Sequence, residues 1–313
     1  MPATILVYDQ DADRYAGLIR LPSRRSAEVR RARNAEEAAP ILGDVDVLYA
    51  WKFPPALYAK AGRLRWLQAM GAGVEWALTP ELPAGVTVTR APGIFGPWIA
   101  EYVVGWCASV TQRMSAYLEA QSQRRWLSGV LPDRLRGKTL TIVGLGDVGR
   151  AVARAARAFD MQVIGVSRSG GPTRGVSRVY QPYELERALA AADFVVLAVP
   201  LTAATRGLVG AIQLAAMKPG AWLMNVARGP VVDDGALIDA LRARRIGGAV
   251  LDVFAIEPLP ADHPLWSAPN VVVTPHVAGP STPEELTPIF NANLARYLAG
   301  RPLRHIVDRS RGY

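Results

Sequence analysis

The G-x-G-x-x-G motif at 144–149 is the pattern in this chain with the most specific chemistry. It follows the apolar run Leu140–Val143 and precedes a helical stretch that we expect over 148–159. In this strand–turn–helix context the glycines allow a tight turn, a close approach of the backbone to a pyrophosphate, and close packing of helix on strand. A helix N-terminus then faces the phosphates. The motif therefore predicts a dinucleotide site formed by Gly144, Leu145, Gly146, Asp147, Val148 and Gly149. A glycine-rich turn without a ligand is the weaker alternative.

The next apolar run, Gln162–Val166, ends in Ser167-Arg168-Ser169 and not in a carboxylate. An NAD site carries Asp or Glu there, about 20 residues after the glycines, to bind the ribose hydroxyls. Two hydroxyls beside a guanidinium would instead bind a 2′-phosphate, and Arg174 is close enough in sequence to contribute. The pattern favours NADP(H), with NAD(H) left possible. The alternative is a solvated arginine in an arginine-rich chain.

Polar side chains follow three later apolar runs at the point where each ends. Arg228 follows the run that begins at Trp222, Asp252 and Glu257 follow the next, and His276 follows Val271–Thr274. Ligands of open α/β sheets bind outside the carboxyl ends of the strands. A cation, a carboxylate and an imidazole gathered there would suit the reduction of a 2-keto acid, which needs a proton donor and a cation for the substrate oxygens. Taken singly, each residue could be a capping, core or ion-pair residue.

Parallel sheets must position these motifs. Short apolar or β-branched runs alternate with helical stretches along the whole chain, which predicts an α/β fold with doubly wound parallel sheets. We expect strands at Thr4–Tyr8, Val45–Trp51, Leu64–Met70, Val86–Thr89, Leu140–Val143, Gln162–Val166, Phe194–Val199, Trp222–Val226, Gly248–Val253 and Val271–Thr274. A largely apolar helix is expected from Trp98 to about Tyr117, buried at a domain or subunit interface. A last helix is expected over Pro288–Ala299.

Composition narrows the classes of partner. The 313 residues carry a net charge of +9, and nearly all of the positive charges are arginines. The local cluster Arg24-Arg25 and Arg30-Arg31-x-Arg33 has no interleaved aromatic residues. We therefore expect no nucleic-acid partner. One cysteine and three histidines argue against an intrachain disulfide and predict no metal site. No run of about 18 apolar residues and no basic leader is present, so we expect a cytoplasmic protein with no membrane segment.

Six segments together resemble the D-2-hydroxyacid dehydrogenase family. They are M-G-A-G-V-E at 70–75, I-A-E-Y at 99–102, G-L-G-D-V-G-R at 144–150, N-V-A-R-G-P-V-V-D at 225–233, A-V-L-D-V-F-A-I-E-P-L-P at 249–260 and T-P-H-V-A-G at 274–279. The Ser-Arg-Ser cluster and the closing D-R-S-R-G-Y are similar to the bacterial A-type glyoxylate/hydroxypyruvate reductase branch. The usual acidic residue after the second strand is replaced by Ser167, a departure that bears on the choice of cofactor.

The resemblance implies roles for individual residues. Arg228, Glu257 and His276 match the catalytic triad, and Asp252 matches a nicotinamide-side contact. Val199, Pro200 and Thr205 match a cofactor-side loop. The substrate carboxylate is expected on backbone N–H groups of Gly71, Ala72, Gly73 and Val74. Trp51 and Trp98 are candidates for the wall of the substrate pocket, and each could equally be a core residue.

The resemblance also implies an organisation and an activity. A flavodoxin-like substrate domain is expected from 1–93 and 284–313, with a Rossmann NAD(P)-binding domain, 94–283, inserted in it. The implied function is NADPH-dependent reduction of a small 2-keto acid to the D-2-hydroxy acid by a homodimer. Two alternatives stay open: a corepressor-like protein that senses NAD(P), and a dehydrogenase for a bulkier 2-keto acid.

Overall fold

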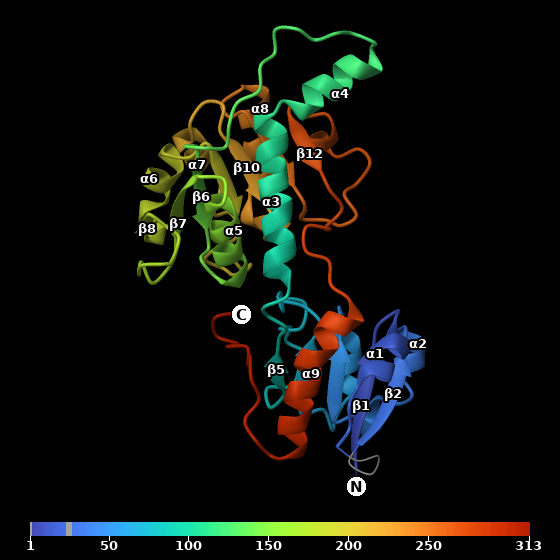
Figure 1. The fold of residues 1–313 in the computed structure, drawn as a ribbon. Helices are drawn as coiled ribbons and strands as arrows, with labels where there is room; N and C mark the ends of the chain where they lie inside the picture. The colour runs from blue at the N-terminus through green and yellow to red at the C-terminus, as the bar shows by residue number, and fades with distance from the viewer. Residues whose placement is uncertain (1, 23–26) are drawn as a thin grey trace. The chain divides into compact units, whose positions relative to one another are not determined.

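The computed structural model describes residues 2–22 and 27–313, which divide into two compact units, Met1–Ile94 with Ser281–Tyr313, and Phe95–Pro280. Each unit contains one parallel sheet with helices packed on it (Figure 1). The expected α/β class with parallel sheets is therefore confirmed. Arg24 and Arg25 lie outside the described residues.

The first unit has a five-stranded sheet in the order β2-β1-β3-β4-β5. Its strands and helices are β1 (Ala3–Tyr8), α1 (Ala12–Leu18), β2 (Ala27–Ala32), α2 (Ala35–Ala38), β3 (Val47–Ala50), β4 (Trp66–Ala69), β5 (Thr87–Thr89) and α9 (Pro283–Leu298), with 3₁₀ turns at Leu42–Asp44 and Pro55–Lys60. Helix α9 supplies a central part of this core. The ring of Phe290 stacks on Tyr49 with 4.2 Å between centroids and on Trp66 at 5.2 Å.

The second unit has a seven-stranded sheet in the order β12-β11-β10-β9-β6-β7-β8. Its elements are α3 (Phe95–Thr111), α4 (Met114–Ser122), β6 (Thr139–Val143), α5 (Asp147–Arg157), β7 (Gln162–Val166), β8 (Arg178–Tyr180), α6 (Leu185–Ala190), β9 (Phe194–Leu197), α7 (Ala211–Ala216), β10 (Trp222–Asn225), α8 (Asp234–Arg242), β11 (Gly248–Leu251) and β12 (Val271–Val273), with 3₁₀ turns at Pro182–Glu184, Gly229–Val231 and Pro264–Trp266.

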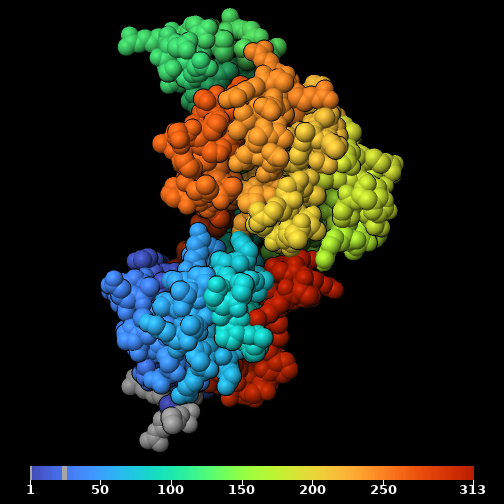
Figure 2. All heavy atoms as spheres, turned by 180° about the vertical axis from the view of Figure 1, so that it is seen from behind, coloured from blue at the N-terminus to red at the C-terminus, as the bar shows by residue number. Residues whose placement is uncertain are grey.

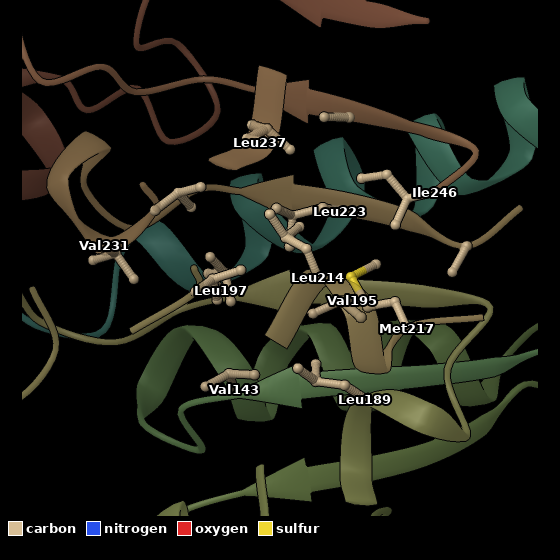
Figure 3. Close-up of a cluster of buried hydrophobic side chains, with 14 of the residues drawn as sticks. Val143, Leu189, Val195, Leu197, Leu214, Met217, Leu223, Val231, Leu237 and Ile246 are labelled. Carbon is tan, nitrogen blue, oxygen red and sulfur yellow. The ribbon is translucent and has the colours of Figure 1, made fainter. Parts of the chain in front are cut away.

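Both faces of this second sheet are buried, which explains why its strands read as continuous apolar runs. Val195, Leu197 and Leu223 face a core formed with α6, α7 and α8 (Figure 3). Val196 and Met224, their neighbours in sequence, face a separate core formed with α3 and α5. The alternation is that of a doubly wound sheet, and it leaves the carboxyl ends of the strands for polar residues.

Four elements differ from the prediction. The three-residue strand β8 (Arg178–Tyr180), at the edge of the seven-stranded sheet, was not predicted. β2 was not predicted, because it is an edge strand that carries Arg30 and Arg31, and these pair with Glu28 and Asp13. The long helix expected over 98–117 is divided into α3 and α4, since Arg113 adopts a left-handed conformation with φ of 56°. α9 begins five residues before the predicted Pro288, at Pro283, where Thr282 and Glu285 form a capping box.

No helix among the described residues is both long and apolar enough to cross a membrane.

Candidate active site

The glycine turn after β6 has the shape that the motif predicts. Gly144 has φ of 103°, and a Cβ there would lie 2.5 Å from the carbonyl oxygen of Ala198. A Cβ on Gly149 would lie 2.0 Å from the Gly144 oxygen, so α5 packs directly on the turn. Gly146 is different, because no atom lies within 4 Å of where its Cβ would be, and it begins α5 without a side-chain cap. The open approach and the uncapped N–H groups fit the pyrophosphate of a dinucleotide.

Neighbouring loops hold this turn in place. The side chain of Leu145 is buried against Gly165, where a Cβ would be 2.5 Å from a leucine methyl carbon. Val199, after β9, packs against Gly144, and the Thr205 hydroxyl closes the same loop by donating to the Pro200 oxygen at 2.6 Å. The structure thus places Val199 beside the glycine turn, with Pro200 and Thr205 bonded to each other.

Ser167, Arg168 and Ser169 extend from the carboxyl end of β7. The two serine hydroxyls lie 3.3 Å apart, and the Arg168 side chain is exposed. Arg174 lies elsewhere: it lines a hollow of about 540 Å³ with Arg154 and Arg157 of α5. Arg178, the first residue of β8, pairs with Ile164 of the parallel strand β7. The loop between the two strands must therefore run from the carboxyl end of β7 back toward its amino end before residue 178. Arg174 therefore has a different neighbourhood from the Ser-Arg-Ser cluster.

The turn that carries Arg228 is packed tightly against the loop that follows β11. Arg228 donates through Nη1 to the Ala227 oxygen at 2.7 Å, and Asn225 Nδ2 donates to the Arg228 oxygen at 3.0 Å. A Cβ on Gly229 would lie 2.0 Å from the carbonyl carbon of Phe254 and 2.2 Å from the Ala255 nitrogen. Only glycine lets the two backbones touch, and this contact fixes Arg228 relative to the loop that leads to Glu257.

Glu257 and His276 form a hydrogen-bonded pair. Glu257 accepts from the Phe254 N–H through Oε1 at 3.1 Å, and its Oε2 lies 2.9 Å from His276 Nδ1. The two side chains keep 27% and 37% of their surface exposed, so the imidazole is held on one side and open on the other. Nε2 is then the ring nitrogen available to exchange a proton with a bound molecule.

His276 sits in a left-handed turn that Asp252 supports. Its φ is 55°, a left-handed value that few residues other than glycine adopt, although histidine, asparagine and aspartate adopt it more often than most. The buried Asp252 carboxylate accepts from Val277 N at 2.8 Å and Ala278 N at 2.9 Å, and from the Thr274 hydroxyl at 2.7 Å. Asp252 was expected as a cofactor contact, whereas its hydrogen bonds in the structure hold this turn. Neither these hydrogen bonds of Asp252 nor the glycine contact at 229 has a signal in the sequence.

In the first unit, the Gly71–Val74 loop follows β4. A Cβ on Gly71 would lie 2.5 Å from the Trp51 ring, so the indole packs flat on the loop backbone. Val74 is buried, while Ala72 and Gly73 are half-buried. No described residue accepts a hydrogen bond from the backbone N–H groups of Ala72 and Gly73. These two groups could therefore bind an anion such as a carboxylate. Trp98, the other tryptophan considered, is 44% exposed on α3 of the second unit.

The comparisons with known proteins agree with this chemistry. Residues 104–278 match the model of the D-isomer specific 2-hydroxyacid dehydrogenase NAD-binding domain. The chain is 32% identical over 275 residues to glyoxylate/hydroxypyruvate reductase A of Serratia proteamaculans, covering 86% of this chain and 88% of that protein. A solved D-isomer specific 2-hydroxyacid dehydrogenase family protein from Aeromonas salmonicida is 39% identical, with a TM-score of 0.90 over 99% of this chain and 100% of that one. An NADPH-dependent glyoxylate/hydroxypyruvate reductase of Sinorhizobium meliloti, solved with NADP and sulfate, is 30% identical with a TM-score of 0.89 over 99% and 100% of the two chains.

Proposed function

Because the chain belongs to the D-isomer specific 2-hydroxyacid dehydrogenase family, we propose that it reduces a small 2-keto acid, of the glyoxylate or hydroxypyruvate type, to the D-2-hydroxy acid with NADPH. The observation that carries the proposal is the hydrogen bond of 2.9 Å between Glu257 Oε2 and His276 Nδ1. This pair follows the carboxyl ends of strands in the same parallel sheet whose β6 leads into the glycine turn. When bound, the nicotinamide supplies the hydride. The residues of the chain handle the proton and the charge of the substrate.

His276 is the proposed proton donor. With Nδ1 bonded to Glu257, its Nε2–H faces outward and can protonate the carbonyl oxygen as that oxygen gains charge. Glu257 fixes the orientation of the ring through its hydrogen bond to Nδ1. Arg228 is proposed to orient the substrate oxygens through charge-assisted hydrogen bonds of its guanidinium. Gly71–Val74 of the first unit stays our candidate for binding the substrate carboxylate, with Trp51 as its support.

The cofactor is proposed to bind at Gly144–Gly149, with Val199, Pro200 and Thr205 forming a side of that site and Asp252 next to the nicotinamide. We propose that Ser167, Arg168 and Ser169 bind the 2′-phosphate and so favour NADPH over NADH. One charge-assisted hydrogen bond contributes about 1.5–3 kcal/mol, which corresponds to roughly tenfold to hundredfold. Since Arg168 is exposed, we expect the lower part of this range.

The test of the activity is a panel of 2-keto acids, including bulkier ones, assayed with NADPH and with NADH. We expect turnover of glyoxylate or hydroxypyruvate, and a loss of about 10²–10⁴-fold in His276→Asn with NADPH binding retained. Binding of NADPH without turnover of any acid would favour the corepressor-like alternative. Preference for a branched or aromatic keto acid would replace the proposed substrate class.

The cofactor preference has a matched control within one loop. Arg168→Ala should lower the NADPH-to-NADH ratio of kcat/KM about tenfold, whereas Arg174→Ala removes the same charge from the hollow beside α5 and should leave the ratio within twofold. Ser167→Asp with Arg168→Ala should bring the ratio to one or below. A parent ratio at or below one, or equal effects of the two single variants, would refute this assignment.

We also propose that the protein is a homodimer. Leu118 of α4 is 66% exposed, and Trp126 and Leu131 in the following segment are 93% and 80% exposed. This segment, green in Figure 2, projects from the rest of its unit, so these large apolar side chains have little of the unit to pack against. Apolar surface of this kind is typical of subunit interfaces. Sedimentation should give twice the 33.7 kDa chain mass, and Trp126→Ser should weaken the association.

A further inference from the structure

A chain of hydrogen bonds connects α3 to the turn that carries His276. The Tyr102 hydroxyl lies 2.7 Å from Thr274 Oγ1, and Thr274 Oγ1 lies 2.7 Å from Asp252 Oδ1. The Thr274 proton is donated to the carboxylate, which can only accept. Tyr102 must therefore be the donor to Thr274. The direction of the chain is thus fixed, from the helix to the carboxylate.

Asp252 is hydrogen-bonded to the backbone of the turn that carries His276. Its two carboxylate oxygens accept from the N–H groups of Val277 and Ala278, and its main-chain oxygen accepts from His276 N at 2.8 Å. The backbone N–H groups of three consecutive residues, 276–278, therefore all donate to Asp252, which is only 1% exposed. A left-handed His276 persists only if its surroundings impose it, and these bonds do so.

Helix α3 also contacts the far end of the same turn. A Cβ on Gly279 would lie 3.0 Å from Ile99 Cγ1, three residues before Tyr102 on the helix. Ala278 is buried in the core that Ile99 and Val103 help to form. Burial raises the pKa of Tyr102 to about 12, so the phenol keeps its proton and remains a donor throughout the neutral range.

We propose that Tyr102 is a positioning residue for the proton donor: its hydroxyl, acting through Thr274 and Asp252, sets the orientation of the His276 ring. It touches none of the reacting atoms. The inference rests on the proposed function in taking His276 as the donor. It assigns to α3 a role in catalysis besides packing on the sheet.

The test uses the histidine ring signals, which do not depend on activity. The chain has only His263, His276 and His305, so a protein labelled with ¹³C-histidine gives a spectrum that His276→Asn assigns. Tyr102→Phe should shift or broaden the His276 signal and leave the other two in place. Tyr117→Phe is the matched control, because it removes a phenol that donates to the Val130 oxygen at 2.6 Å, away from the turn.

Kinetics supply the second readout. Tyr102→Phe should lower kcat about threefold to tenfold, the effect of one hydrogen bond, while the KM for the keto acid stays within twofold. Thr274→Val should reproduce both effects, and Thr274→Ser, which keeps the hydroxyl, should restore them. This pair also decides the matter if Tyr102→Phe does not fold.

Two outcomes would overturn the inference: an unchanged His276 signal in Tyr102→Phe and Thr274→Val, or a shifted signal with unchanged kcat. If the parent protein reduces no 2-keto acid, the proposed function fails, whereas the histidine spectrum still shows whether Tyr102 holds the turn.

Discussion

Gly229→Ala would test the geometry of the site with a single methyl group. Gly229 has no positive φ, so alanine is not strained by its own backbone. The added Cβ would instead meet the carbonyl carbon of Phe254 at 2.0 Å and the Ala255 nitrogen at 2.2 Å. Both are backbone atoms, which cannot rotate away as a side chain can. One of the two loops must therefore move.

The size of the movement sets the expected effect. Ordinary van der Waals contact begins at 3.4 Å, so the loops must separate by about 1.4 Å. The displaced Phe254 N–H is the group that holds Glu257 Oε1, and Glu257 in turn holds His276. A misplacement of about 1 Å in a catalytic group can lower the rate about 10²-fold. Overpacking of this kind costs about 1–3 kcal/mol, which lowers Tm by roughly 2–12 °C in a unit of this size.

The assay is kcat/KM for glyoxylate or hydroxypyruvate, together with NADPH affinity by titration and Tm by calorimetry. We expect kcat/KM to fall about 10²-fold while the Kd for NADPH changes less than threefold, since Gly144–Gly149 is not touched. Gly17→Ala is the control, because no atom lies within 4 Å of its added Cβ. A Gly229→Ala enzyme with kcat/KM within threefold of the parent would refute the view that this backbone contact aligns Arg228 with Glu257.

Three further changes separate the roles of the site residues. Glu257→Gln replaces the carboxylate that holds His276 Nδ1, so kcat should fall roughly tenfold or more, the effect of one hydrogen bond to a charged group, with NADPH binding intact; an unchanged kcat would exclude this role. Arg228→Lys keeps the charge but loses the planar fork, and should lower kcat/KM more than tenfold with NADPH binding intact; full activity would remove Arg228 from the site. Gly146→Ala places a methyl group in open space, so Tm without cofactor should stay the same while the Kd for NADPH rises about tenfold or more; equal affinity would show that the pyrophosphate does not approach there.

Six of the seven strands of the second unit could be predicted within one or two residues, because a sheet buried on both faces leaves continuous apolar runs. The short edge strand β8 (Arg178–Tyr180) could not. β7 was predicted at its observed bounds, Gln162–Val166. β2 was not, since an edge strand tolerates charged residues and resembles a basic loop in sequence. In α9 two prolines, Pro283 and Pro288, obscured the start, although Thr282 and Glu285 carry the capping signal.

It could be predicted from the sequence that Arg228, Glu257 and His276 lie at the carboxyl ends of neighbouring strands, because each follows one of three consecutive apolar runs. Their alignment was not predictable, because it depends on contacts between residues distant in sequence. The bond of Tyr102 to Thr274 spans 172 positions, and only the fold brings them together. The place of Arg174 was also beyond the sequence, since nearness along a loop does not say where the loop turns back.

The return of the chain to its first unit has a consequence for the order in which the protein is completed during synthesis. Residues 95–280 are contiguous and hold every strand of their own sheet, so this unit can fold as soon as it leaves the ribosome. The N-terminal sheet emerges earlier, yet Tyr49 and Trp66 lack the stacked ring of Phe290 until α9 has been made. The part of the chain that is synthesised first is therefore the last to acquire its full core. Until residue 290 has been added, the rings of Tyr49 and Trp66 lack the aromatic partner that stacks on both of them.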